Sequence, residues 1–315
     1  MPITRMRNRR NPKSYEENDL GFGTKVSTQG GRLLNKDGSF NVLRVGQRLW
    51  TPYQNLVEMP WPQFLGLVFL YYLVVNAFFG GLFYLSGLEG FNGAQPGHWL
   101  LEYAQLFFFS IQTFTTVGYG GISPQSPMAN ALAALDALVG ILTVALATGL
   151  IFARFSRPKA NILYSRHALI GPYLEGSGFF LRMVNGRHNK LINLRAIVIM
   201  TWSEESSGQR SRKFATLPLE RDKVVMFPLN WTLVHPIQED SPLYQKGADE
   251  LEEMEAEIIV LLEGYDETFA QTVHSDTSYT YKEIRCNARF KPMYYSTEGK
   301  TVLELGLIDA FEETV

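Results

Sequence analysis

Cysteine is almost absent from this 315-residue chain, in which Cys286 is the only one. A single cysteine cannot form an internal disulfide, so the sequence excludes a disulfide-stabilised fold and agrees with a reducing compartment for the C-terminal region. Lysine and arginine are missing altogether from residues 61–153. The overall composition, with 46% hydrophobic residues and a net charge of −2, fits many soluble proteins and hides this uneven distribution.

Two long apolar runs define the charge-poor part of the chain. Residues 64–85 contain no charged residue, and residues 128–155 contain only Asp136 and Arg154. Each run is long enough to cross the roughly 30 Å hydrocarbon layer as a helix. The first run lies too far from residue 1 to be a cleaved signal peptide, so we expect both to remain as membrane spans.

Basic residues flank the two runs on their outer sides. Many lysines and arginines precede Trp61, and Arg154, Arg157 and Lys159 follow the second run. Membrane insertion tends to keep such residues in the cytoplasm, so both termini are expected on that side.

Three other segments have recognisable patterns. Residues 49–59 combine helical apolar spacing with neighbouring tryptophans and predict a short helix on the inner membrane surface. Residues 98–113 are apolar but too short for a third span, so they predict a re-entrant helix. After Pro158 the apolar residues alternate with period two, which predicts a β-sandwich of short strands.

The N-terminal residues up to about 40 are polar, basic and rich in glycine. We expect them to be mobile at least as far as Asn35. The predicted domains are therefore an N-terminal segment with the interfacial helix (1–60), a transmembrane pore domain (61–155) and a β-sandwich domain (156–315).

The motif Thr-Thr-Val-Gly-Tyr-Gly at residues 115–120 lies between the re-entrant helix and the second span. Backbone carbonyls replace the hydration oxygens of an ion when successive C=O groups point to one axis, and Gly118 and Gly120 permit the required conformations. The Thr116 hydroxyl can add an oxygen at the inner end. Val117 and Tyr119 are expected to point away from the axis and pack against the re-entrant helix. One chain supplies one wall of such a ring, so the motif predicts a homotetramer.

Beyond this motif, the sequence resembles the inward-rectifier potassium channels, and specifically their prokaryotic members. The resemblance rests on the filter motif, on GLIFARFSRPK at 149–159, on HPIQEDSPLY at 235–244 and on IIVLLEGYDETFAQ at 258–271. It implies a two-transmembrane-helix pore with a re-entrant pore helix, followed by a cytoplasmic immunoglobulin-like β-sandwich. It further implies a non-enzymatic protein of the bacterial inner membrane. Potassium, bound at Thr116 to Gly120, is then the only expected metal, with no other cofactor and no nucleic-acid partner.

The second run carries the expected gate. Val144, Thr148 and Phe152 share a face at four-residue spacing, so Val144 and Thr148 are assigned to the cavity. Four Phe152 rings converging on the axis would exclude water and ions, and the resemblance places the bundle-crossing gate at this residue.

Asp136 is the one carboxylate inside the second run and needs a partner or water. Its helical position lies about 80° from Val144, toward the re-entrant helix. We assign it to filter support together with Thr115 and with Gln112, its expected hydrogen-bond partner. The rival role is a cavity charge that attracts cations and blockers.

Regulation is inferred mainly from the resemblance. Strongly rectifying relatives carry acids at the positions of Val144 and Asn193, so block by Mg²⁺ or polyamines is expected to be weak. Glu263 remains as a possible cytoplasmic pore charge, beside Gly264 in what resembles the family's apical constriction loop. Arg154, Arg157 and Lys159 could attract anionic phospholipids, including phosphoinositides, or only fix topology.

Two other functions compete with the channel. A non-conducting, membrane-anchored β-sandwich scaffold or receptor explains the two spans but not the filter motif. An anchored enzyme is not favoured, because the serines and glutamates at 203–207 come without a nucleophile elbow, phosphate loop or metal cluster.

Overall fold

The computed structural model describes residues 21, 31–43, 45–46, 51–156, 160–206 and 209–314. The chain forms two compact units, one of residues Gly46–Arg157 and one of Met1–Val45 with Pro158–Val315. This division differs from the domain boundaries proposed above, because the segment before Gly46 is grouped with the β-rich unit rather than with the interfacial helix.

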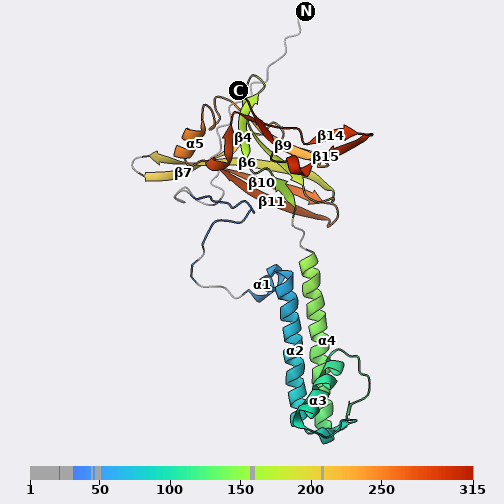
Figure 1. Ribbon diagram of the computed structural model, residues 1–315. Coiled ribbons are helices and arrows are strands. Elements are labelled where there is room, and N and C mark those ends of the chain that lie inside the picture. Colours follow the sequence, from blue (N-terminus) through green and yellow to red (C-terminus); the bar gives the residue numbers. More distant parts are fainter. Residues whose placement is uncertain are drawn as a thin grey trace, which may run out of the picture. The chain divides into compact units, whose positions relative to one another are not determined.

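The helical unit contains both predicted spans (Figure 1). Its long helices, α2 (Trp61–Leu85) and α4 (Pro127–Phe155), run side by side and are long and apolar enough to cross a membrane. Prolines in their first turns cost no hydrogen bond there, and Ser126 caps α4 by accepting the amide proton of Ala129. The shorter elements are α1 (Pro52–Glu58), a 3₁₀ turn (Leu88–Gly90), the strand pair β1 (Phe91–Asn92) and β2 (Ser123–Pro124), and α3.

Helix α3 (Trp99–Phe114) is the predicted re-entrant segment. His98 caps its start, with Nδ1 accepting from the Leu100 amide at 3.3 Å. Two glycines let it approach the long helices closely. A Cβ at Gly80 of α2 would lie 2.9 Å from the Phe107 Cα, and a Cβ at Gly140 of α4 would lie 2.1 Å from the Phe114 carbonyl oxygen. Helix α3 is therefore wedged between the other two by backbone contact.

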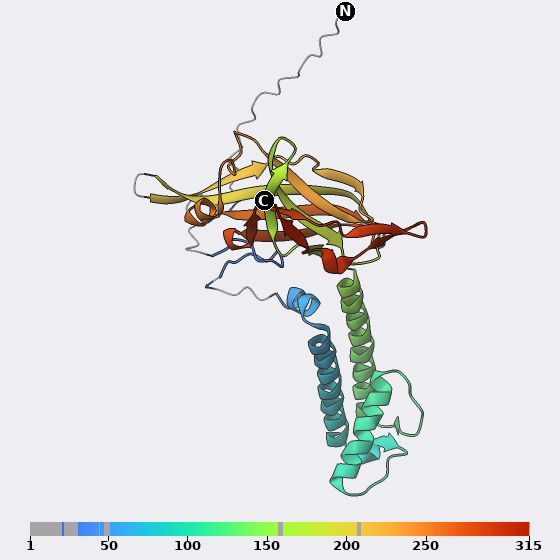
Figure 2. The same cartoon turned by 45° about the horizontal axis from the view of Figure 1, so that its top comes forward.

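The second unit is a β-sandwich, and both views show its strands stacked in layers (Figures 1 and 2). One five-stranded sheet has the order β11-β10-β6-β7, with β8 paired to β6, and the other has the order β12-β4-β5-β3, with β9 paired to β5. The strands of the first sheet are β6 (Leu191–Ser206), β7 (Gln209–Leu217), β8 (Lys223–Met226), β10 (Glu257–Asp266) and β11 (Gln271–Thr280). Those of the second are β3 (Ile162–Tyr164), β4 (Ala168–Tyr173), β5 (Gly176–Asn185), β9 (Asn230–Ile237) and β12 (Ile284–Cys286). The remaining elements are α5 (Ala248–Glu253), the pairs β13 (Ala288–Phe290) with β16 (Phe311–Glu313) and β14 (Tyr294–Thr297) with β15 (Lys300–Leu303), and 3₁₀ turns at Tyr281–Glu283 and Leu305–Leu307.

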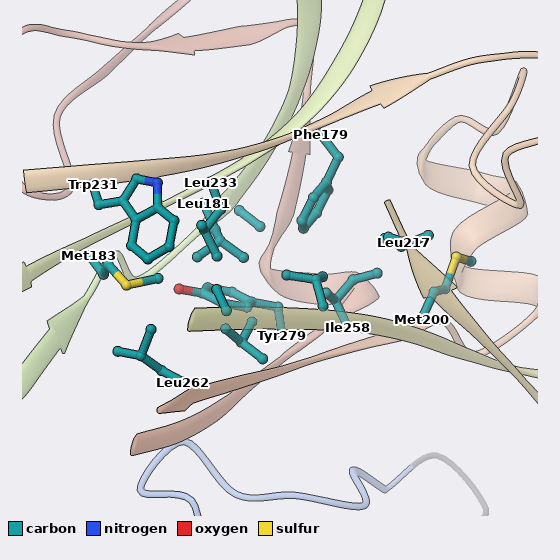
Figure 3. Packing of buried hydrophobic residues seen from close by; sticks show 14 of the residues in the cluster. Phe179, Leu181, Met183, Met200, Leu217, Trp231, Leu233, Ile258, Leu262 and Tyr279 are labelled. Atoms are coloured by element: carbon teal, nitrogen blue, oxygen red, sulfur yellow. The ribbon is translucent and has the colours of Figure 1, made fainter. Parts of the chain in front are cut away.

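One apolar core lies between the two sheets (Figure 3). Leu194, Ala196, Val198 and Met200 of β6 point into it, as the period-two pattern predicts. They meet Phe179, Leu181 and Met183 of β5 from the other sheet. The alternation in sequence thus corresponds to the two faces of a sheet.

Leu33 and Leu34 are buried, which corrects the expectation of a mobile segment as far as Asn35. They pack with Ile199, Phe214 and Ile259 on the outer face of the β6–β10 sheet. The buried Glu257 carboxylate accepts the Leu33 amide at 2.8 Å and forms an ion pair with Arg212 at 3.2 Å. This short segment is therefore held by apolar contact and by a paired, hydrogen-bonded charge.

His235 in β9 is expected to make the stability of the sandwich depend on pH. The ring is buried, with Nδ1 2.7 Å from the Pro218 carbonyl oxygen and Nε2 2.8 Å from the Ser241 hydroxyl, and burial lowers its pKa. The unfolded chain, with an ordinary histidine pKa of about 6.5, binds the proton first as pH falls. The free energy of unfolding is therefore expected to decrease below pH about 6.5, until the lower pKa of the folded state is passed.

Thermal unfolding of the full-length protein at several pH values tests this. His235→Gln should weaken the acid dependence, whereas His188→Gln, which changes an exposed histidine, should leave it unchanged. Equal acid dependence in the wild type and in His235→Gln would contradict the assignment.

Candidate functional site

The segment after α3 is tied to the end of that helix by its own backbone. The amides of Thr115 and Thr116 donate to the carbonyls of Ile111 and Thr113, each at 3.0 Å. The amides of Val117 and Gly118 both donate to the Gln112 carbonyl, at 2.9 and 3.2 Å. Because α3 is wedged between the long helices, these bonds fix where the motif begins.

The backbone of the motif alternates in conformation. Thr116, Gly118 and Gly120 have φ values of +59°, +52° and +80°, whereas Val117 and Tyr119 do not have positive φ. Alternation of left-handed residues with ordinary ones turns successive carbonyls toward the same side, which is the arrangement that coordinates a dehydrated cation. Glycine adopts this region without steric cost, and Thr116 is held there by the bonds to α3 and by its hydroxyl, which donates to the Thr115 carbonyl at 2.7 Å.

The side chains of Val117 and Tyr119 are 54% and 81% exposed in the single chain, so most of their surface is not covered by residues of the same chain.

Asp136 is fully buried on α4, on the side that also buries Ala129 and Gly140. Neither carboxyl oxygen has a hydrogen-bond partner among the described residues, so the predicted bond from the Gln112 side chain is not formed. The part of Gln112 that supports the motif is its backbone carbonyl. The buried position of Asp136 fits support of α3 better than it fits a charge in an open cavity.

Val144, Thr148 and Phe152 follow one another on α4 and are all exposed, with Phe152 at 73%. Phe155, three residues further, instead contacts Trp61 with ring centroids 5.0 Å apart. The last turn of α4 thus carries two largely exposed aromatic rings, Phe152 at 73% and Phe155 at 65%, of which only Phe155 has a ring contact with Trp61.

Arg154 is engaged within the helical unit. Its guanidinium donates to the carbonyls of Leu56, Val57 and Met59 at the end of α1, and lies over the rings of Trp61 and Phe64, 4.5 and 4.4 Å from their centroids. These contacts tie the inner end of α4 to the α1–α2 junction, a role that the sequence did not indicate. Arg157 and Lys159 lie outside the described residues.

Glu263 and Gly264 lie within strand β10, which corrects their expected position in a loop. The pairing of β10 with β6 shifts between Glu263 and Tyr265, where Gly264 lies opposite two residues of β6, so the bulge is in β6. Arg195 lies directly opposite Glu263 on β6, and His274 lies opposite it on β11. These three and Asp276 line a cavity of about 300 Å³, where burial raises the pKa of Asp276.

Comparisons with known proteins agree with this arrangement. Residues 67–157 match a family model described as "Ion channel", and residues 162–313 match the "Inward rectifier potassium channel C-terminal domain". The inward rectifier potassium channel Kirbac3.1 of Paramagnetospirillum magnetotacticum is 37% identical over 290 residues, which cover 90% of this chain and 97% of that protein. This chain belongs to the inward-rectifier potassium channel family.

Eukaryotic relatives match less of the chain. The human inward rectifier potassium channel 4 is 31% identical over 210 residues, or 61% of this chain and 46% of the human protein. The chain is therefore a subunit of a potassium-selective inward-rectifier channel, an integral membrane protein and not an enzyme. A non-conducting scaffold is not favoured.

Proposed function

We propose that four copies of the chain assemble around one axis, with the carbonyls of residues 116–120 forming the potassium sites. The alternating φ signs of this segment are the observation that supports the proposal, because a backbone that alternates left-handed with ordinary residues can turn successive carbonyls to one side. One chain supplies only one wall of such a ring, and the exposed Val117 and Tyr119 side chains are suited to contact with a neighbouring subunit. Potassium is the permeant ion and crosses passively.

Flux from liposomes tests this proposal. The purified protein should migrate as a tetramer and release potassium far faster than sodium. Equal potassium and sodium flux, or no flux from a well-formed tetramer in any lipid mixture, would contradict it.

We further propose that both termini are cytoplasmic, in a bacterial inner membrane. The basic residues outside the two spans, and their absence from residues 61–153, support this orientation. Protease accessibility of the β-sandwich in inside-out vesicles, compared with intact cells, tests the orientation.

Phe152 is the proposed gate. Its ring projects from the last turn of α4, so four such rings could close the inner end of the pore as an apolar constriction. Phe152→Ala should raise the single-channel open probability severalfold, because the smaller side chain leaves room for water. Phe155→Ala is the matched control: it removes an aromatic ring from the same turn, but one that packs on Trp61. An unchanged open probability in Phe152→Ala would refute the gate.

Weak block by Mg²⁺ and polyamines is proposed from the charges around Glu263. Arg195 faces Glu263 across the β6–β10 pair and offsets its charge, so the surface attracts cations less than a bare acid would. Arg195→Gln should therefore strengthen block by internal spermine, by roughly threefold to tenfold at low ionic strength. Glu263→Gln should weaken the spermine block. The double variant keeps the net charge of the wild type, so its block should resemble that of the wild type. Voltage ramps on excised patches measure this. An unaltered spermine affinity in Arg195→Gln would place the pair away from the ion path.

Anionic phospholipids, including phosphoinositides, are proposed to bind Arg157 and Lys159 after the second span. The charge of these residues supports the proposal. Flux should then depend on the anionic lipid content of the liposomes and lose that dependence in the variant Arg157→Gln with Lys159→Gln.

A further inference from the structure

Three polar side chains, one from each helix of the pore, are buried at a single level of the helical unit. They are Asn76 of α2, Ser110 of α3 and Asp136 of α4, and each is 0% exposed. Each lies about one helical turn from a close backbone contact, because Gly80 meets Phe107 and Gly140 meets Phe114. The three polar groups are thus enclosed where the helices approach most closely.

Each hydrogen bond among these groups is donated away from Asp136, and no described group donates to the Asp136 carboxyl. Asn76 Nδ2 donates to the Tyr72 carbonyl at 2.8 Å, and Ser110 Oγ donates its only proton to Asn76 Oδ1 at 3.1 Å. Ser110 is also the side chain that interacts with the Asp136 carboxyl, although not in hydrogen-bond geometry, and its oxygen has only lone pairs left to offer there. Both oxygens of Asp136 lack a partner among the described residues. If Asp136 were ionised, its carboxylate oxygens and the Ser110 hydroxyl oxygen would both be acceptors, and no hydrogen bond could form between them.

The segment between residues 61 and 153 supplies no cation to pair with Asp136. Residues 61–153 contain neither lysine nor arginine, so a second copy of the chain cannot supply one from its membrane-spanning part either. Arg154 lies about five turns further along α4 and is bonded to carbonyls near α1. A buried, unpaired charge in the hydrocarbon layer costs several kcal/mol, whereas a neutral carboxyl carries its own donor.

We propose that Asp136 is protonated and donates to Ser110 Oγ, which completes a hydrogen-bond chain from Asp136 through Ser110 and Asn76 to the Tyr72 carbonyl. The inference rests on the proposed function and deepens the support role of Asp136. The chain links all three helices and holds α3 at a fixed height. Since the Gln112 carbonyl of α3 anchors the filter amides, Asp136, Ser110 and Asn76 act as positioning residues for ion selection.

Four variants of the full-length, reconstituted channel test the proposal. Asp136→Asn keeps a donor of the same size, Asp136→Ala removes it, Ser110→Ala removes the middle of the chain, and Ala133→Ser adds a hydroxyl one turn away on α4 as a control. The potassium-to-sodium flux ratio should stay within about twofold of the wild type in Asp136→Asn and in Ala133→Ser. It should fall roughly tenfold in Asp136→Ala and Ser110→Ala, the expected effect of losing a buried hydrogen bond.

Infrared difference spectra report the protonation state of Asp136 directly, which a loss of packing alone would not reveal. Subtracting the Asp136→Asn spectrum from the wild-type spectrum at neutral pH should reveal the C=O stretch of a protonated carboxylic acid, and Ser110→Ala should shift this band. Carboxylate bands in that difference, or an Asp136→Asn channel as unselective as Asp136→Ala, would overturn the inference. Loss of polyamine block with an unchanged flux ratio in Asp136→Asn would also overturn it, in favour of a cavity charge.

Failure of the proposed function can be told apart from failure of this inference. A wild-type tetramer that does not select potassium refutes the proposed function. A selective wild type without the carboxylic-acid band refutes only the protonated Asp136. If Asp136→Ala does not assemble, the wild-type minus Asp136→Asn spectrum and the Ser110→Ala band shift still decide the matter.

Discussion

Replacing Gly118 with alanine is expected to abolish potassium selectivity. Gly118 has φ of +52°, and an L-residue in this region costs about 1–2 kcal/mol in each subunit. Thr116, two residues before it, already carries such a cost, so the segment would hold two strained side-chain-bearing residues in every copy. Rotation of the adjoining peptide relieves this backbone strain at the lowest energy, and it turns a carbonyl away from the ion path. The potassium-to-sodium flux ratio of reconstituted channels should fall at least about tenfold.

Gly66→Ala provides the matched control for this prediction. Gly66 lies within helix α2, where a Cβ would meet no atom within 4 Å, so alanine should be tolerated without a change in selectivity. A Gly118→Ala channel with wild-type selectivity would mean that the alternating backbone is not the basis of ion recognition.

The second large effect is expected at Arg154. Arg154→Lys keeps the positive charge but loses the planar fork that reaches the carbonyls of Leu56, Val57 and Met59. Hydrogen bonds to a charged group contribute about 1.5–3 kcal/mol each, so their loss should destabilise each subunit by about 3 kcal/mol or more. The expected results are a lower thermal unfolding midpoint of the tetramer and altered channel opening.

The same variant separates the two roles of Arg154. If this residue mainly attracts anionic lipid, lysine should replace it fully, and Arg154→Lys should match the wild type in stability and in flux across a series of anionic lipid contents. If the guanidinium ties α4 to α1, Arg154→Lys should fail almost as completely as Arg154→Gln. Thermal unfolding and liposome flux on the three proteins distinguish these outcomes.

Local patterns were sufficient to predict the two spans, the short helix between them and the sandwich. The apolar runs match α2 and α4 because length and hydrophobicity alone determine a membrane helix. The inward-facing residues of β6 follow from strict alternation.

Contacts between distant parts of the sequence could not be read in this way. Arg195 faces Glu263 only because β6 pairs with β10 in one register, and no local pattern specifies that register. Leu33 and Leu34 are two apolar residues in a polar stretch, too few to show a period. The expected Gln112–Asp136 bond was wrong because helical spacing gives a direction but not a distance, and neither Asp136 oxygen has a hydrogen-bond partner among the described residues.

The alternating φ values at residues 116–120 have a consequence for the assembled channel. Carbonyl dipoles that share one orientation repel each other unless a positive charge lies among them. In the proposed tetramer the bound potassium ion would therefore stabilise the filter that it passes through. A filter without bound ions would be less ordered than an occupied one.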